Sequence, residues 1–281
     1  MSEAILPCDL RPTMDKILKA YLHQYYHLSI CTALLCAFTY QATVTQIHWT
    51  YCVWVGVATL VMYSFFVLFK LSFAQLKAIL INYPTRVIIL PLVAMVGMIV
   101  VQFHWVESIA LVIAGTVSLF YFRPVFGTSF SLRAHFLLKP LSIGLVFALS
   151  TAFVPYIHSG YLIGESVILS TGRLCFIMAL ALIFDLGDVV IDQETQTIAM
   201  PQKLGVVPTK VVASIILLVG GLIELNGAWT FLLELPALLA LLVTYFFSFV
   251  LIIISGPKKE DWFYLLVVDG MIGLPFLLTM V

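Results

Sequence analysis

Long apolar runs, separated by short polar segments, restrict the fold of this sequence more than any other feature. Hydrophobic residues make up 62% of the 281 residues and charged residues only 10%, whereas a soluble domain carries about 25% charged residues. So few charges cannot cover a water-soluble domain with polar surface. A run of about 20 apolar residues is long enough to cross a bilayer as a helix. The chain is therefore expected to be an integral, multi-pass membrane protein.

The apolar runs are continuous and do not alternate with a period of two, which favours helices over a membrane β-barrel. They predict an all-α bundle of about nine transmembrane helices, organised as a single domain over residues 1–281. To within a few residues, the predicted helices cover 18–40, 49–69, 87–103, 106–122, 137–155, 163–184, 209–225, 229–254 and 261–281.

Lysine and arginine are confined to alternate connections between the predicted helices, with one exception. They occur in the N-terminal segment and after the second, fourth, sixth and eighth helices, while the other loops contain none. By the positive-inside rule these basic segments face the cytoplasm, so the N-terminus is predicted to be cytoplasmic. The formal net charge of zero gives no electrostatic reason to expect binding to nucleic acid.

Arg173 is the exception, because it lies ten residues into the sixth predicted helix. A charge at that depth is costly unless it is paired or hydrated. Asp269, eight residues into the last predicted helix, is the acidic residue at a matching depth. We therefore predict an intramembrane charge pair between Arg173 and Asp269, with two separate water-lined positions as the alternative.

The segment IFDLGDVVIDQETQTIAMPQKLG, residues 183–205, contains three regularly spaced aspartates. Asp185, Asp188 and Asp192 follow the spacing i, i+3, i+7, which places them on one helix face. Three neighbouring carboxylates repel one another unless a cation lies between them. Mg²⁺ typically takes one or two protein carboxylates and completes its shell with water and substrate phosphate oxygens. The spacing predicts a Mg²⁺ site at the cytoplasmic mouth of the bundle, with a solvated acidic helix end as the alternative.

This segment resembles the second aspartate-rich motif of the UbiA superfamily of intramembrane prenyltransferases, Asp-x-x-Asp-x-x-x-Asp after the sixth helix. Leu204 and Gly205 follow at the family's usual distance, and Tyr121 with Pro124 closes the fourth predicted helix as in the family. The stretches RLCFIMALALIFDLGD and DWFYLLVVDGMIGLPFLL are similar to a divergent bacterial branch. The resemblance implies a UbiA-like bundle in the bacterial inner membrane, with one cavity open to the cytoplasm. It also implies Mg²⁺ as cofactor, a prenyl diphosphate as donor and a hydrophobic acceptor.

The family's first aspartate-rich motif, Asn-Asp-x-x-Asp-x-x-x-Asp after the second helix, is absent from this chain. The corresponding segment, MYSFFVLFKLSFAQLKAIL, contains no acidic residue. Because the two motifs share the metal ions in the family, the resemblance implies a reduced metal site here. Lys70, Arg123 and Lys139 are candidates for binding the diphosphate instead, although the positive-inside rule and anionic lipid headgroups also explain their presence.

Three functions are compatible with these patterns. The first is a divergent prenyltransferase that moves an isoprenoid group from a prenyl diphosphate to an aromatic or lipid-like acceptor. The second is a catalytically silent relative that binds an isoprenoid, a quinone or a membrane partner. The third is a small-solute transporter, whose ion site would be expected near the bilayer midplane and not at the cytoplasmic boundary. We predict the first function and keep the second as its alternative.

Overall fold

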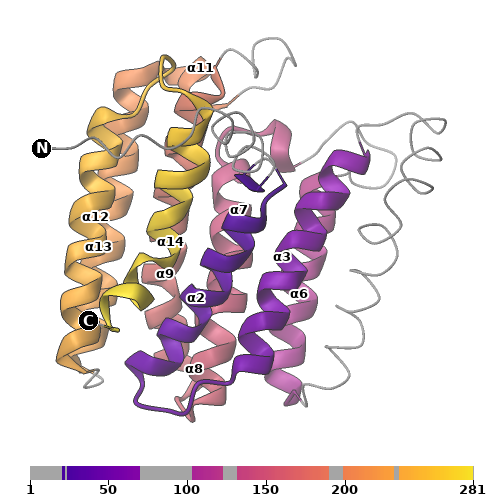
Figure 1. Cartoon of the computed structure of the whole chain (residues 1–281), viewed down its shortest axis with the longest axis vertical. Helices are drawn as coiled ribbons and strands as arrows, with labels where there is room; N and C mark the ends of the chain where they lie inside the picture. The colour runs from indigo at the N-terminus through magenta and orange to yellow at the C-terminus, as the bar shows by residue number, and fades with distance from the viewer. Residues whose placement is uncertain are drawn as a thin grey trace, which may run out of the picture.

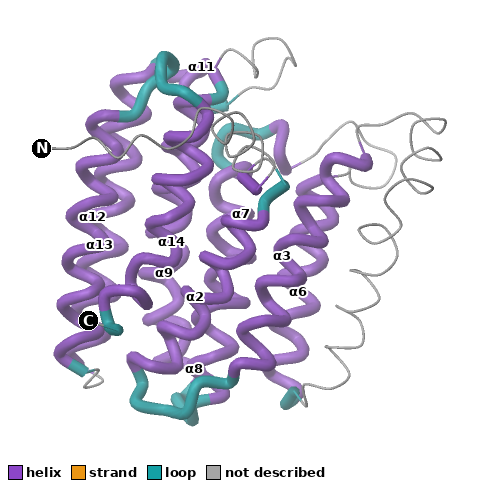
Figure 2. Tube along the Cα trace, in the orientation of Figure 1, coloured by secondary structure: helices purple, strands orange, loops and turns teal. Residues whose placement is uncertain are grey.

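A computed structural model of the chain describes residues 21–22, 24–69, 103–122, 132–189, 199–230 and 234–280. All regular structure in these ranges is helical, which confirms the all-α prediction. The long helices run side by side along the longest axis of the molecule and form a bundle (Figure 1). Short turns and loops connect them at the two ends (Figure 2).

The long helices agree well with the apolar runs of the sequence. They are α2 (Tyr26–Ala42), α3 (Trp49–Phe69), α6 (Trp105–Phe122), α7 (Leu138–Ala148), α9 (Ile163–Gly187), α12 (Val206–Thr230), α13 (Leu235–Ile254) and α14 (Asp269–Leu278). Two short helices, α8 (Val154–His158) and α11 (Met200–Leu204), and a 3-10 turn, η2 (Leu132–Ala134), complete the described α-helical and 3-10 structure. The predicted helix over 87–103 lies almost entirely outside the described residues.

Two π-helical segments interrupt otherwise regular helices. The segment η3 (Leu149–Phe153) joins α7 to α8, so the three elements together correspond to the predicted helix over 137–155. The segment η4 (Phe263–Val268) leads directly into α14. A π-helical turn accommodates an extra residue within a helix and occurs frequently at functional sites.

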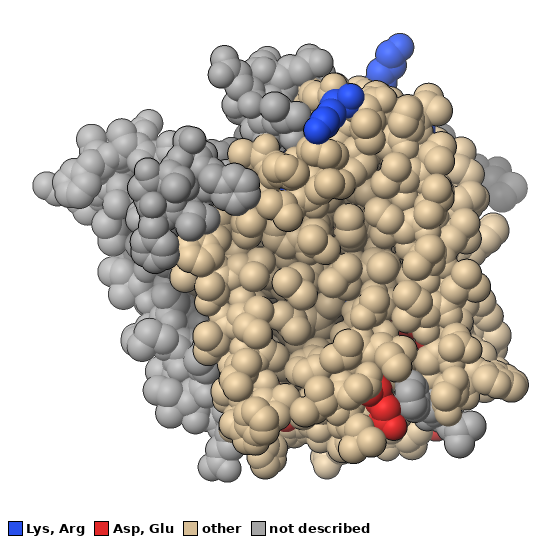
Figure 3. Space-filling model, turned by 180° about the vertical axis from the view of Figure 1, so that it is seen from behind, with Lys and Arg blue, Asp and Glu red and all other residues tan. Residues whose placement is uncertain are grey.

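Four helical stretches are long and apolar enough to cross a membrane, as judged by length and composition: Leu138–His158, Ile163–Gly187, Val206–Gly227 and Leu235–Ile254. Shorter apolar helices are Trp49–Tyr63, Trp105–Tyr121 and Phe263–Leu278. Figure 3 shows a broad uncharged face, with basic side chains at one end and acidic side chains at the other. These features are compatible with a membrane protein, because the side chains that would contact lipid are apolar.

The helix α9 lies at the centre of the bundle, where it packs against α7 and α12, and α14 packs against α2. The contact between α9 and α12 depends on glycine. A Cβ added at Gly172 would lie 2.6 Å from the Cβ of Glu224, and one added at Gly220 would lie 2.6 Å from the Cβ of Cys175. Small residues allow two membrane helices to approach closely. This close approach brings Glu224 of α12 against α9.

Candidate functional site

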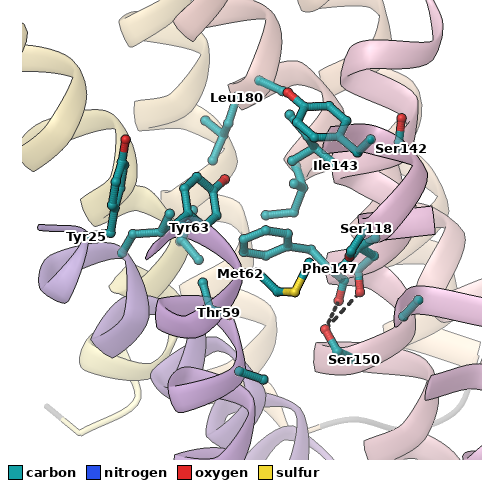
Figure 4. A pocket seen from close by; sticks show the side chains of 18 of the residues that line it. Tyr25, Thr59, Met62, Tyr63, Ser118, Ser142, Ile143, Phe147, Ser150 and Leu180 are labelled. Atoms are coloured by element: carbon teal, nitrogen blue, oxygen red, sulfur yellow. Dashed lines mark hydrogen bonds between the residues drawn. The ribbon is translucent and has the colours of Figure 1, made fainter. Parts of the chain in front are cut away.

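A cavity of about 610 Å³ lies among α2, α3, α6, α7, α9 and the η4–α14 segment. Its volume falls within the range of small-molecule binding sites. Most of its wall is apolar, including Leu28, Trp54, Val55, Met62, Leu111, Phe147, Ile177 and Leu180. Figure 4 shows side chains from α3, α7 and α9 around the same space. The body of the cavity therefore suits a hydrophobic molecule.

Charged side chains also line the cavity: Arg133, Lys139, Asp185, Asp188 and Asp269. The first four come from η2, from the beginning of α7 and from the end of α9. The Nζ atom of Lys139 lies 2.7 Å from Oδ1 of Asp185, and these side chains are only 8% and 2% exposed. A buried ion pair of this kind holds both groups in place, because separating them would leave a buried charge without its counter-ion.

The structure brings together several of the predicted site residues. Asp185, Asp188 and Lys139 line one cavity, although they were predicted for different roles. Arg133, from the same loop as the predicted ligand Arg123, lines it too. The remaining predicted site residues, Asp192, Lys70 and Arg123, lie outside the described residues.

The aspartate motif does not continue as one regular helix face. The helix α9 ends at Gly187, and Asp188 is its C-cap residue. In the part of the chain that the structure describes, no three Asp, Glu, His or Cys residues gather as a metal site. Asp185 and Asp188 nevertheless supply two carboxylates in one cavity, which is the number that Mg²⁺ typically uses when phosphate oxygens complete its shell.

The predicted pair between Arg173 and Asp269 is wrong. Arg173 donates hydrogen bonds from Nη2 and Nε to Oε1 of Glu224, at 2.9 and 3.2 Å. The hydroxyl of Tyr245 donates to Oε2 of the same carboxylate at 2.7 Å. The helix predicted over 209–225 would place Glu224 next to a loop. Because α12 continues to Thr230, Glu224 is instead buried in the bundle beside Arg173.

Asp269 occupies the cavity wall at the start of α14 and is only 5% exposed. Two tyrosines that sequence analysis did not select, Tyr25 and Tyr63, line the same region, and their ring centroids are 4.8 Å apart. Aromatic residues near helix ends are common in membrane proteins. The positions of these two tyrosines in the sequence therefore did not indicate a site.

Comparisons with protein-family models, with curated proteins and with solved structures find no match to this chain. The chemistry of the site must therefore be argued from its own residues. Its defining combination is an apolar cavity with two basic and three acidic side chains in its wall.

Proposed function

We propose that the chain is a divergent, UbiA-like membrane prenyltransferase. In this proposal it binds a prenyl diphosphate in the cavity and transfers the isoprenoid group to an aromatic or lipid-like acceptor. The observation that best supports the proposal is that one cavity is lined both by apolar side chains and by charged side chains. An isoprenoid tail requires apolar surroundings, and a diphosphate requires charged partners.

Each part of the cavity has a role in this proposal. Arg133 and Lys139 would contact the diphosphate, because guanidinium and ammonium groups bind phosphate oxygens through charge-assisted hydrogen bonds. Asp185 and Asp188 would hold Mg²⁺, which when bound neutralises negative charge on the leaving diphosphate. The ion pair with Asp185 would orient Lys139 toward the same phosphate oxygens.

In the transfer step, the bond between C1 of the isoprenoid and the diphosphate oxygen breaks, and the oxygen keeps the electron pair. The apolar and aromatic wall, including Tyr63 and Phe147, would shield the resulting allylic cation from water. Aromatic faces also attract a cation through their negative quadrupole. The acceptor then forms the new bond to C1 and releases a proton.

A catalytically silent relative that binds an isoprenoid or a quinone is the second candidate. The buried contact between Lys139 and Asp185 favours it, because a carboxylate that already pairs with lysine is a weaker ligand for Mg²⁺. Such a protein would retain the apolar cavity but would not need a working diphosphate site. The two candidates therefore differ in whether Mg²⁺ and the aspartates contribute to binding.

The test is a binding titration of the purified full-length protein with a non-hydrolysable farnesyl diphosphate analogue. Binding is measured with Mg²⁺ and with EDTA, for the wild-type protein and for Asp188→Asn. We expect Mg²⁺ to strengthen binding by at least tenfold, and we expect Asp188→Asn to remove most of that gain, because each charge-assisted contact contributes about 1.5–3 kcal/mol.

Asp261→Asn is the matched control, because Asp261 is exposed and does not line the cavity. Its binding should equal that of the wild-type protein. Analogue binding that ignores both Mg²⁺ and Asp188 would contradict the transferase proposal and support the silent relative. Absence of any binding would also contradict the transferase proposal and leave the silent relative as the better account.

A further inference from the structure

Two histidines lie together at the end of the bundle that is farthest from the charged part of the cavity wall. His158 is the last residue of α8, and His48 lies in the connection between α2 and α3. Figure 1 shows α8 and this connection at one end of the bundle and α11 at the other. A helix rises about 1.5 Å per residue, so Asp185 lies about 33 Å from the start of α9, which follows α8. The histidines are therefore separate from the cavity, whose described lining includes neither of them.

The two imidazole rings are spaced like ligands of one metal ion. Their centroids are 4.8 Å apart and their planes meet at 64°. Two imidazoles that bind a metal ion at about 2.0–2.1 Å, with an angle of about 90–110° at the metal, have ring centroids roughly 4.5–5.2 Å apart. The separation between His48 and His158 falls within this range. His48 is exposed, and the side chain of His158 is 30% exposed, so an ion in water can reach both rings.

Tyr40 supports both rings from inside the bundle. It is 1% exposed, and its ring centroid lies 6.1 Å from that of His158 and 6.4 Å from that of His48. The rings of Tyr40 and His158 meet at 85°, which is the favourable edge-to-face arrangement of aromatic rings. Packing on a buried tyrosine restricts how far either imidazole can move.

A buried carboxylate lies behind His158. Glu107 belongs to the first turn of α6 and is 0% exposed. Its Oε2 atom accepts a hydrogen bond from the backbone nitrogen of His104 at 3.0 Å. Its Oε1 atom lies 3.3 Å from Nδ1 of His158, yet accepts no hydrogen bond from the part of the chain that the structure describes. Because a buried acceptor without a donor is costly, Oε1 favours the tautomer of His158 that carries its proton on Nδ1.

This tautomer determines what His158 can bind. A neutral imidazole has one N–H group, and its other nitrogen is an acceptor or a metal ligand. With the proton on Nδ1, toward Oε1 of Glu107, the lone pair of Nε2 is free to bind a metal ion. Histidines that bind metals almost always donate their other ring N–H to a carboxylate, a backbone carbonyl or water, which fixes the orientation of the ring. Glu107 is positioned to be that partner.

The residue types also indicate which ion would bind. Imidazole nitrogens suit Zn²⁺, Cu²⁺ and Ni²⁺, whereas Mg²⁺ takes oxygen ligands. Within the described ranges, no three His, Cys, Asp or Glu residues gather as a metal site, which leaves the two imidazoles as the direct protein ligands. Water can fill the remaining positions, as it fills the open position of catalytic zinc sites.

We propose that His48 and His158 bind a divalent transition-metal ion of the Zn²⁺ type, and that Glu107 positions His158 by accepting a hydrogen bond from its Nδ1 atom. The bound ion connects the loop between α2 and α3 to the end of α8. This site does not depend on the proposed prenyl transfer, since it shares no residue with the cavity.

The test is a calorimetric titration of the full-length protein with Zn²⁺. The protein is purified without a histidine tag and stripped of metal with EDTA, which is then removed, and excess Mg²⁺ is present to compete for carboxylate sites. We expect one Zn²⁺ to bind per chain. His48→Ala and His158→Ala should each weaken binding by at least tenfold, because even the loss of a partner that only orients a ligand costs about 10–100-fold.

Glu107→Gln removes the charge behind His158 and should weaken binding by about 10–100-fold. The spectrum of the Cu²⁺ form in electron paramagnetic resonance separates positioning from direct ligation. Glu107→Gln should keep the coupling to two imidazole nitrogens that the wild-type protein shows, whereas each histidine variant should show one. His48→Ala carries the test if Glu107→Gln does not fold, since His48 is exposed.

His104→Ala is the matched control, because His104 is exposed and contacts Glu107 through its backbone nitrogen. Its affinity for Zn²⁺ should equal that of the wild-type protein. Absence of Zn²⁺ binding in the wild-type protein, or equal binding in both histidine variants, would overturn the site. A loss in His104→Ala as large as in His48→Ala would overturn the assignment of the two ligands. Unchanged affinity in Glu107→Gln would overturn the positioning role of the carboxylate.

Discussion

Three side chains from three helices, Arg173, Glu224 and Tyr245, form one hydrogen-bonded network inside the bundle. The guanidinium group also lies 5.7 Å from the ring centroid of Phe38. Replacing Glu224 with alanine would leave a buried arginine that is 1% exposed without its counter-ion. We predict a loss of about 3–5 kcal/mol in stability and a clearly lower melting temperature, measured by size-exclusion chromatography after heating in detergent.

Tyr245→Phe is a milder change to this network than Glu224→Ala. It removes one hydrogen bond to the carboxylate and keeps the ion pair. Its cost should be smaller, about 1.5–3 kcal/mol. The double variant Arg173→Met with Glu224→Leu should recover most of the stability that Glu224→Ala loses, since it leaves no buried charge. Equal melting temperatures for wild type and Glu224→Ala would show that the network does not stabilise the fold.

The same residues show what the sequence could and could not predict at this scale. The depth of Arg173 in an apolar run correctly required a partner, because an isolated charge there is costly. The partner was wrongly chosen because hydropathy ended the predicted helix near residue 225, whereas tertiary packing extends α12 to Thr230. The spacing of Asp185 and Asp188 predicted a Mg²⁺ site, and both residues line the cavity. Their neighbour Lys139 comes from another helix, and no local pattern encodes that contact.

At the scale of the helices, the close contact between α9 and α12 depends on glycine. A Cβ at Gly172 would lie 2.6 Å from the Cβ and 2.9 Å from the backbone nitrogen of Glu224. Since backbone cannot move aside as a flexible side chain can, Gly172→Ala should push the two helices apart. We predict a loss of about 1–3 kcal/mol, seen as a lower melting temperature in the same heating assay.

Gly164→Ala is the control in the same helix, because nothing lies within 4 Å of a Cβ at that position. Alanine is a better helix former than glycine by about 0.5–1 kcal/mol, so this variant should be unchanged or slightly more stable. A similar loss in both variants would mean that the loss does not come from the close contact between α9 and α12.

Most helices could be predicted from the sequence, because apolar runs that are long enough to span a bilayer leave the backbone few alternatives to a helix. The prediction for 49–69 coincides with α3, and that for 163–184 ends three residues before the end of α9. The π-helical segments η3 and η4 were not predicted. An extra residue in a turn changes hydrogen bonding but leaves the apolar character of the run unchanged.

At the scale of the whole molecule, the bundle encloses a mostly apolar cavity that also has charged groups in its wall. The cavity combines both environments, since Trp54 and Leu111 line it together with Arg133 and Asp188. Sequence analysis predicted the polar end from the aspartate spacing. It could not predict the size or shape of the cavity, because these depend on how elements far apart in the sequence pack around it. An amphiphilic ligand would therefore lie with its apolar tail between the helices. The space between the helices would limit the length of that tail.

This limit leads to a prediction about chain length. Ala114 of α6 lines the apolar part of the cavity and is 6% exposed. Ala114→Phe adds a bulky ring where the tail of a long isoprenoid would lie, and overpacking of this kind costs about 1–3 kcal/mol. We expect the affinity for a geranylgeranyl diphosphate analogue to fall by about tenfold or more. Affinity for the shorter geranyl analogue, which need not reach Ala114, should change by less than about threefold.

Val112→Phe introduces the same ring two residues away, at a position that is 68% exposed and outside the cavity lining. It should leave both affinities unchanged, so that any effect of Ala114→Phe can be assigned to the cavity and not to α6 as a whole. An equal loss for the short and the long analogue would mean that the ring disturbs the charged end of the site. No loss for either would mean that the isoprenoid tail does not occupy this cavity, and the functional proposal would then lose the observation that supports it.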